Sequence, residues 1–273
     1  MDLTIRGARI LVVVKAYPNP SKLHRETVCT AGLLDGEHWV RIYPVPYRLL
    51  KDESQFPKYG WIKVDIERRT KDFRPESFHL LRTESDSILV DGKIPPGPSG
   101  WRERKKYVLK EVYDSMDALI ARAKSPERIS IGVVKPKEVQ GVVGEETDRE
   151  WDPETLALLQ EQDLFEPNDS RLRVVKKVPY KFSYLFRTTD GKDRKMMVED
   201  WEIGALFWHA MKLAGYNEAE AVAKVKEKLW SFATQKDLYL IMGTTQEYHL
   251  TAPNPFVIIG LFYPPFDSQL DLF

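Results

Sequence analysis

The 273-residue sequence predicts an α+β protein, with a small N-terminal β-barrel and a C-terminal α+β domain that has two helices against a sheet. Short apolar or alternating segments separated by turn residues fill the first third, which is typical of a small barrel. The last third holds two segments with apolar residues at helical spacing. After them, Pro264 and Pro265 cannot continue a strand or a helix, so a flexible tail is expected.

These features predict four parts: a barrel over residues 1–95, a helix with an acidic connector over 96–175, the α+β domain over 176–263 and the tail over 264–273. Within the barrel, the predicted strands are residues 9–16, 26–34, 38–45, 61–69, 77–82 and 87–90. Asp35 and Gly36 separate the second strand from the third, and this pair is a strong hairpin signal. By length and strand count, a five-stranded barrel of the oligonucleotide-binding (OB) type is expected.

The middle of the chain predicts one helix over residues 101–123, a strand over 129–135 and an acidic, turn-rich connector over 138–168. Apolar residues recur on one face of the helix. Its first turns also carry four cations, which oppose the helix dipole. They form either a solvated face or a cluster that faces phosphates: Arg102, Arg104, Lys105 and Lys106.

The last third predicts a hairpin, two helices and two strands. Residues 180–188 and 195–199 flank the turn pair Asp190 and Gly191. Asp200 caps a helix that runs to residue 214, and Asn217 caps the next one. Residues 238–242 and 256–262 are continuous apolar runs, so both are expected as central, covered strands.

Composition limits the function. The 41 basic and 41 acidic residues balance, which argues against a surface that coats nucleic acid but leaves a local basic patch open. The single cysteine, Cys29, excludes a disulfide framework and a cysteine-based zinc site. Because no signal peptide or membrane-spanning stretch is evident, we expect a soluble, cytoplasmic protein. No phosphate-binding or dinucleotide motif occurs, so no cofactor is expected, except Mg²⁺ if the protein is a nuclease.

Basic and aromatic residues alternate through the first third. Single-strand binders use aromatic rings to stack bases and cations to hold phosphates. Trp39, Arg41 and Tyr43 share one strand face by the period-two rule, although an arginine packed between aromatics can also be purely structural. The predicted nucleic-acid contacts are Lys15, Tyr17, Lys22, Arg25, Trp39, Arg41, Tyr43, Tyr47 and Arg48.

Three acids cluster after a predicted strand. Glu199, Asp200 and Glu202 occupy a position where Mg²⁺-dependent nucleases place carboxylates. No companion lysine is evident in the local sequence. The alternative is that these acids complement the dipole of the helix that begins there.

The final pentapeptide is the most specific motif: Gln269, Leu270, Asp271, Leu272 and Phe273. It resembles the peptide with which bacterial replication and repair proteins bind the DNA sliding clamp. The resemblance implies that Leu272 and Phe273 fill a hydrophobic clamp pocket, which contributes about 3–6 kcal/mol before ordering costs. It further implies that Leu270 lines the pocket edge and that Gln269 occupies a polar subsite. Alternatively, the two apolar residues fold onto the protein's own core.

Three other segments resemble uncharacterised prokaryotic proteins with two small β-barrel-like domains, found in genome-defence contexts: residues 15–18, 39–44 and 253–260. This resemblance transfers no activity. The function expected from the sequence is DNA binding with recruitment to the sliding clamp, in replication, repair or genome defence. The alternatives are a clamp-tethered metal-dependent nuclease and a clamp-binding inhibitor without DNA contact.

Overall fold

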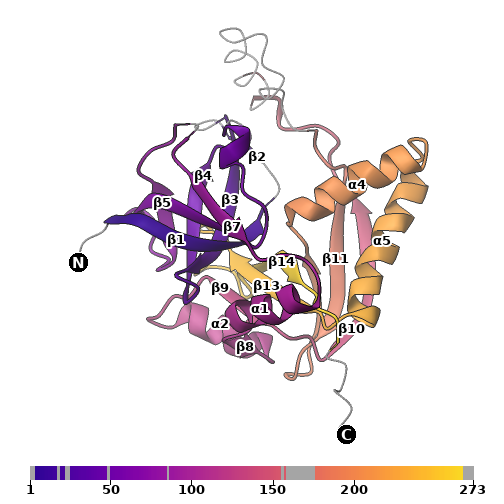
Figure 1. Cartoon of the computed structure of the whole chain (residues 1–273). Helices are drawn as coiled ribbons and strands as arrows, with labels where there is room; N and C mark the ends of the chain where they lie inside the picture. The colour runs from indigo at the N-terminus through magenta and orange to yellow at the C-terminus, as the bar shows by residue number, and fades with distance from the viewer. Residues whose placement is uncertain are drawn as a thin grey trace, which may run out of the picture. The chain divides into compact units, whose positions relative to one another are not determined.

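A computed structural model describes residues 4–16, 19–21, 25–47, 50–84, 86–154, 157 and 176–266, without the side chains of 19–21 and 25–27. The chain forms two compact units (Figure 1). The first comprises Met1–Lys93, Glu146–Tyr180 and Glu199–Gly204. The second comprises Ile94–Glu145, Lys181–Val198 and Ala205–Phe273. In the described part of the chain, no helix is long and apolar enough to cross a membrane.

The first unit contains a closed barrel of five strands: β1 (Thr4–Lys15), β3 (Arg25–Leu34), β4 (His38–Val45), β5 (Gly60–Arg68) and β6 (Ser77–Leu80). They pair in the order β1-β3-β4-β6-β5, and β5 pairs back with β1. All these pairs are antiparallel except β4 with β6, which is parallel. By chain order, the barrel therefore runs first, second, third, fifth, fourth, which is the OB arrangement. The predicted OB-like barrel is confirmed.

Three short elements complete this unit. Strand β2 (Asn19–Ser21) pairs with β3, and β7 (Leu89–Lys93) pairs with β5. A 3₁₀ turn, η2 (Asp52–Ser54), lies between β4 and β5. All three are additions to the barrel rather than members of its closed circuit.

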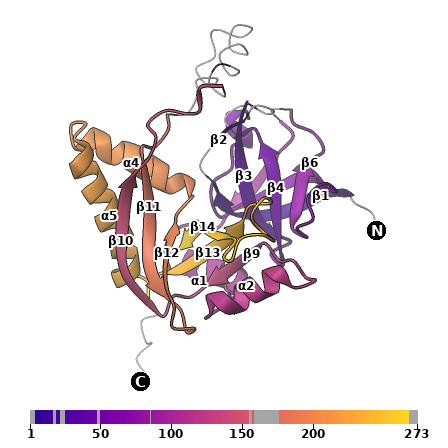
Figure 2. The ribbon, with the colours of Figure 1, turned by 180° about the vertical axis from the view of Figure 1, so that it is seen from behind.

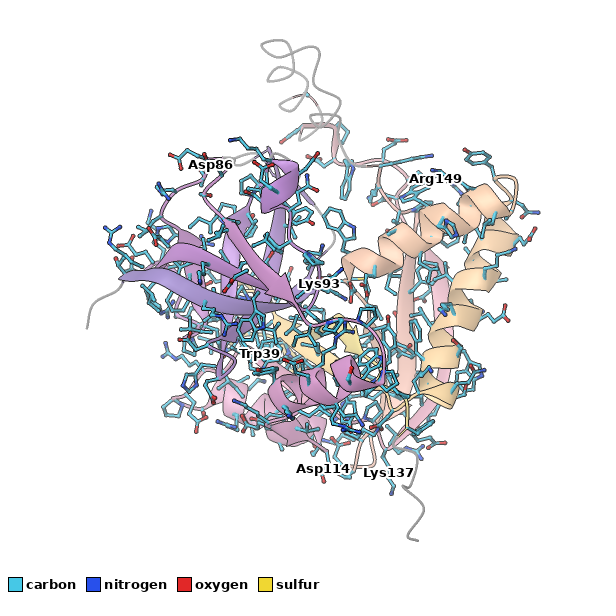
Figure 3. All side chains as sticks on the ribbon, in the orientation of Figure 1. Trp39, Asp86, Lys93, Asp114, Lys137 and Arg149 are labelled. Atoms are coloured by element: carbon cyan, nitrogen blue, oxygen red, sulfur yellow. The ribbon has the colours of Figure 1, made fainter. Side chains whose placement is uncertain are left out.

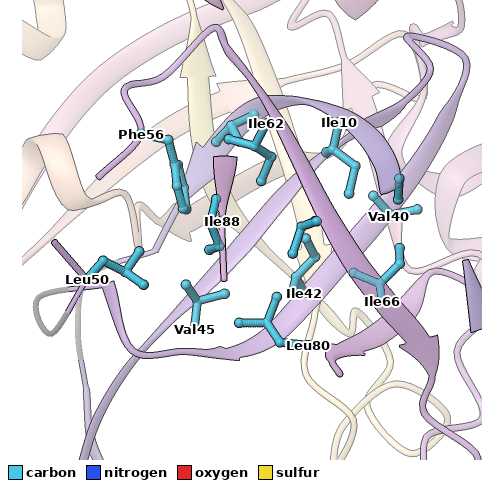
Figure 4. Close-up of a cluster of buried hydrophobic side chains, with 13 residues drawn as sticks. Ile10, Val40, Ile42, Val45, Leu50, Phe56, Ile62, Ile66, Leu80 and Ile88 are labelled. Carbon is cyan, nitrogen blue, oxygen red and sulfur yellow. The ribbon is translucent and has the colours of Figure 1, made fainter. Parts of the chain in front are cut away.

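Alternating apolar residues explain why these strands close around a core. On β1, Ala8, Ile10 and Val12 point inward, and Val40 and Ile42 do the same on β4 (Figure 4). The predicted Asp35–Gly36 turn has positive φ at both residues (51° and 74°), as a type I′ hairpin turn requires. At Gly32, a Cβ atom would lie 2.4 Å from the carbonyl oxygen of Leu11, so only glycine permits this closeness of β3 and β1.

The second unit contains a three-stranded sheet with the order β10-β11-β12. Its strands are β10 (Glu138–Glu146), β11 (Tyr180–Arg187) and β12 (Asp193–Met197). Helices α4 (Trp201–Leu213) and α5 (Glu218–Gln235) pack against it, and both views show α5 alongside β10 and β11 (Figures 1 and 2). The Phe182 ring contacts that of Phe207 at 6.3 Å, and the Tyr184 hydroxyl donates to the Leu229 carbonyl at 2.7 Å. The predicted pair of helices against a sheet is confirmed.

A second sheet of this unit has the order β14-β13-β9-β8. Its strands are β14 (Phe256–Phe262), β13 (Tyr239–Thr244), β9 (Ile131–Val134) and β8 (Val112–Tyr113), and helices α1 (Pro98–Val108) and α2 (Met116–Lys124) pack on it. Trp101 of α1 contacts the Phe262 ring at 5.5 Å. Asp114 and Lys137, labelled in Figure 3, hydrogen-bond through their backbones to the ends of the β11–β12 hairpin at Thr189 and Arg187.

Local structure differs from the sequence prediction at three places. The single helix expected over residues 101–123 is two helices, because β8 pairs with β9 between them and Ser115 caps α2 by accepting from the Ala118 N–H. Within the expected connector, Glu138–Glu146 is the edge strand β10. Only one of the two apolar runs is central, because β13 lies between β9 and β14, whereas β14 ends the sheet.

Candidate nucleic-acid interface

The loop of residues 69–76 joins β5 to β6, the fourth and fifth barrel strands. Its backbone is closed by three hydrogen bonds: Arg69 N–H to the Ser77 carbonyl, Asp72 N–H to that of Arg69 and Ser77 N–H to that of Arg74. In OB-type barrels, this loop, the loop between the first two strands and the face of the second and third strands form the oligonucleotide surface. The loop is therefore a candidate part of a nucleic-acid surface.

A buried ion pair holds this loop in shape. The Asp72 carboxylate accepts from Arg74 Nη2 at 2.6 Å, from Arg74 Nε at 2.9 Å and from the Ser77 hydroxyl at 2.7 Å. It also accepts from the Arg74 backbone N–H at 3.1 Å. Burial acts to raise the pKa of Asp72, but the hydrogen bonds from Arg74 and Ser77 outweigh it and lower the pKa to about 2. The loop is thus a fixed platform.

This platform places Arg69 beside β4 and carries a second cation and a ring. The Arg69 guanidinium carbon lies 5.5 Å from the ring centroid of Tyr43, which is on the outward face of β4 because Val40 and Ile42 point into the core. Lys71 is exposed and Phe73 is half-buried. We call the set Tyr43, Arg69, Lys71 and Phe73 the β4–loop surface. Such a mixture of rings and cations is what single-strand binding requires.

Only Tyr43 of this set was expected from the sequence. Arg69, Lys71 and Phe73 were missed because the position of their loop, whose end lies next to β4, depends on the parallel pairing of β4 with β6, at Arg41 with Ser77. That pairing has no local signal. The run of Arg68, Arg69 and Lys71 just after an alternating strand was the available clue.

Arg41 points outward from β4 but is buried, and its backbone N–H donates to the Glu76 carbonyl at 2.7 Å. Burial and the neighbouring Arg74 charge lower the pKa of its guanidinium, with burial the larger cause. Burial likewise raises the pKa of the nearby Cys29 thiol. We therefore leave Arg41 out of the β4–loop surface. Trp39, on the same strand face, is half-buried (Figure 3).

A second cluster centres on Lys58, which precedes β5. Its ammonium donates to Asp200 Oδ2 at 2.6 Å and to Glu202 Oε2 at 2.9 Å. Burial acts to lower the pKa of Lys58, but the two carboxylates outweigh it and raise the pKa above its usual range. The other oxygen of Asp200 accepts from the Glu202 backbone N–H at 3.0 Å. Asp200 thus caps the start of α4, as the sequence predicts.

The predicted carboxylate set therefore has specific partners in this structure. Both oxygens of Asp200 are engaged, Glu202 shares Lys58, and Glu199 is half-buried. Among the residues that the structure describes, no group of three or more His, Cys, Asp or Glu side chains is placed to hold a metal ion. The lysine that pairs with Asp200 and Glu202, Lys58, comes from a distant loop and not from the local sequence.

Lys15, at the end of β1, belongs to the same cluster. Its amine donates to the Tyr47 hydroxyl at 3.3 Å and to the Phe56 carbonyl at 3.2 Å. It also lies 4.5 Å from the ring centroid of Tyr47 and 5.6 Å from that of Trp201. Burial, followed by the positive charge of Lys58, lowers the pKa of Lys15 to about 8. Lys15 is thus a half-buried amine that is partly neutral near physiological pH.

Most of the other residues that the sequence predicts as nucleic-acid or clamp contacts lie outside the part of the chain that the structure describes. Arg25 begins β3, with only its backbone described. The other positions lie outside the described residues: Tyr17, Lys22 and Arg48 of the nucleic-acid set, and Gln269, Leu270, Asp271, Leu272 and Phe273 of the clamp motif. By sequence, Tyr17 and Lys22 stand in the connection between the first two barrel strands.

Residues 112–273, well over half of the chain, match the family model of a domain of unknown function, DUF8757. The chain belongs to this family. Residues 6–110 match a second domain of unknown function, DUF8758. No curated protein sequence is similar to this chain.

One solved structure that the chain matches is that of a murine DNA-binding protein bound to double-stranded DNA. The alignment covers 97% of this chain and 95% of the murine one, at 10% identity and a TM-score of 0.30. A TM-score this low supports no argument about fold or function, so the site stands on its own geometry.

Proposed function

We propose that this protein binds single-stranded DNA on its OB-like barrel and is recruited to the bacterial sliding clamp by the peptide of residues 269–273, in replication, repair or genome defence. The observation that supports DNA binding is the β4–loop surface, which lies where barrels of this strand order hold oligonucleotides. The observation that supports clamp binding is the pentapeptide itself.

The chemistry of the surface favours a single strand. Tyr43 and Phe73 offer rings to unpaired bases, and each stacked base contributes about 1–3 kcal/mol. Arg69 and Lys71 offer cations to the phosphates of the DNA backbone. For single strands, each neutralised phosphate makes the slope of log binding constant against log salt concentration more negative by about 0.7. Two cations on a protein without net charge give weak binding alone. A tether to a clamp that already encircles DNA raises the effective concentration and offsets this weakness.

Fluorescence anisotropy with a labelled single-stranded oligonucleotide tests the DNA contact. We expect Tyr43→Ala to weaken binding about 5- to 150-fold, because one stacking ring is lost. Arg69→Ala should weaken it and also flatten the salt dependence, because one phosphate contact is lost. Lys63→Ala is the matched control, since Lys63 is an exposed cation on β5 away from the loop. Equal affinity of all three variants would contradict the proposed surface.

Co-elution with a bacterial sliding clamp, with and without DNA, tests the tether. Deleting residues 269–273, or substituting Leu272→Ala with Phe273→Ala, should abolish co-elution and leave the melting temperature unchanged. A drop in melting temperature would instead assign these apolar side chains to the protein's own core. Clamp binding without any salt-dependent DNA affinity would identify an inhibitor of the clamp rather than a DNA-binding protein.

A further inference from the structure

Lys15 and Lys58 of the first unit lie close enough for the charge of Lys58 to shift the pKa of Lys15. They differ in whether they form ion pairs with the nearby carboxylates. Lys58 holds both nearby carboxylates, those of Asp200 and Glu202. Lys15 forms no ion pair with any described residue, and its partners among those residues are a hydroxyl, a carbonyl oxygen and two rings. A lysine with a purely structural role would be expected to share the carboxylates, because burying an ammonium without a counter-charge costs stability.

The position of Lys15 relates it to the proposed DNA surface. It is the last residue of β1, where the connection to the second barrel strand begins. In barrels of this type, that connection and the loop between the fourth and fifth strands both border the oligonucleotide. The rings of Tyr47 and Trp201, 5.5 Å apart, flank the amine with apolar surface. Such a setting suits the sugar and bases around a reacting group.

From this arrangement we infer that Lys15 is a nucleophilic amine that forms an imine with the open-chain aldehyde of an abasic site in DNA. The inference rests on the proposed DNA binding. An abasic deoxyribose carries an aldehyde when its ring opens, and it leaves a gap in the base stack beside which aromatic rings can insert. Amines that are desolvated or adjacent to another cation are those that proteins use for this reaction.

The reaction needs no additional reactant. The neutral amine nitrogen bonds to the aldehyde carbon, and the carbonyl oxygen leaves as water with both hydrogens of the amine. Hydrolysis of the imine reverses both steps and restores Lys15. The lowered pKa of Lys15, about 8, leaves a useful fraction of the amine neutral at physiological pH. The charged groups that act on it are Lys58, which favours the neutral amine, and Glu202 and Asp200, which oppose it.

The test is reductive trapping with sodium cyanoborohydride on an oligonucleotide that contains one abasic site. We expect a covalent adduct that peptide mass spectrometry places on Lys15. The adduct should be lost in Lys15→Arg, which retains the positive charge, and kept in Lys51→Arg, since Lys51 is an exposed lysine paired with Asp86. Its yield should rise with pH through about 8. An adduct that persists in Lys15→Arg would overturn the inference.

Two further measurements separate this inference from the proposed function. Anisotropy on the same abasic oligonucleotide, without reductant, reports binding alone. Normal binding with no adduct would overturn the inference and leave DNA binding intact. Trapping with free 2-deoxyribose 5-phosphate requires no DNA binding. Selective labelling of Lys15 by this sugar phosphate would support a reactive amine at Lys15, even if DNA binding fails. Uniform labelling of all lysines would overturn the inference.

Discussion

The first unit contains two buried charge clusters, and they are built in different ways. In the loop of residues 69–76, one acid meets one base: the Asp72 carboxylate accepts its hydrogen bonds from Arg74 and Ser77. Around Lys58, two acids and two lysines come together, but both acids bind the same lysine. The first cluster is matched and shapes a loop. The second is uneven and leaves Lys15 with neutral partners among the described residues.

This difference shows that the partners decide the outcome for a buried charge, because burial by itself disfavours the charged form of both Asp72 and Lys15. A carboxylate that receives several donors becomes a stronger acid, as the pKa of about 2 for Asp72 shows. An ammonium buried beside two rings and two oxygens without a paired carboxylate loses its proton more readily, so a larger fraction is the neutral, nucleophilic amine, as the pKa of about 8 for Lys15 indicates. The matched cluster stabilises the fold, and the uneven one costs stability at a position where chemistry is possible.

Breaking the matched cluster should have the largest effect. Asp72→Ala leaves the buried Arg74 guanidinium without that carboxylate, and we expect about 3–5 kcal/mol of destabilisation by urea unfolding. Because the pKa of Asp72 is lowered, its contribution in the wild type is present above the ordinary pKa and is lost as the pH falls towards 2. Asp91→Ala removes an exposed carboxylate from β7 and should leave unfolding unchanged. Equal loss in both variants would contradict the comparison.

Removing the shared cation of the uneven cluster should have the next largest effect. Lys58→Met leaves Asp200 buried without its ammonium, which should cost about 2–4 kcal/mol in urea unfolding. The same change removes one charge that lowers the pKa of Lys15 and frees Asp200 and Glu202 to raise it. The pH at which Lys15 becomes reactive should therefore increase. Lys58→Arg, which keeps the charge, should retain more of both properties.

The smallest effect should come from Lys15 itself, with the opposite sign. Lys15→Met removes a desolvated amine and should stabilise the protein by roughly 1 kcal/mol at pH 7, because lost hydrogen bonds and partial exposure offset most of the gain. The wild-type pKa is about 8 against an ordinary 10.5, so the unfolded chain binds more protons between these values. Wild-type stability then rises with pH, and the advantage of the variant should disappear above about pH 10. A destabilised variant at pH 7 would assign Lys15 a structural role.

Much of the fold follows from local sequence. Asp35 and Gly36 predict their hairpin because few residues tolerate two positive φ angles, and both have them here. Asn217 predicts the start of α5 because its side chain accepts from the Glu220 N–H. The prediction of one helix over residues 101–123 was wrong because a distant strand, and not the local sequence, decides the conformation in the middle of this segment. Its apolar spacing continues through Val112 and Tyr113, but pairing with β9 overrides that pattern.

The sequence by itself therefore determined the elements whose signals lie within a few residues, the alternating barrel strands and the pentapeptide motif. The tertiary structure alone decided which distant residues meet. Parallel pairing of β4 with β6 brings the loop of residues 69–76 to Tyr43. A bridge between Ala16 and Asp200 holds Asp200 next to the end of β1, where it meets Lys58, 142 residues away in the sequence. A local sequence pattern predicts the conformation of its own segment. A site made from loops depends on which strands pair, and no single segment specifies its pairing partner.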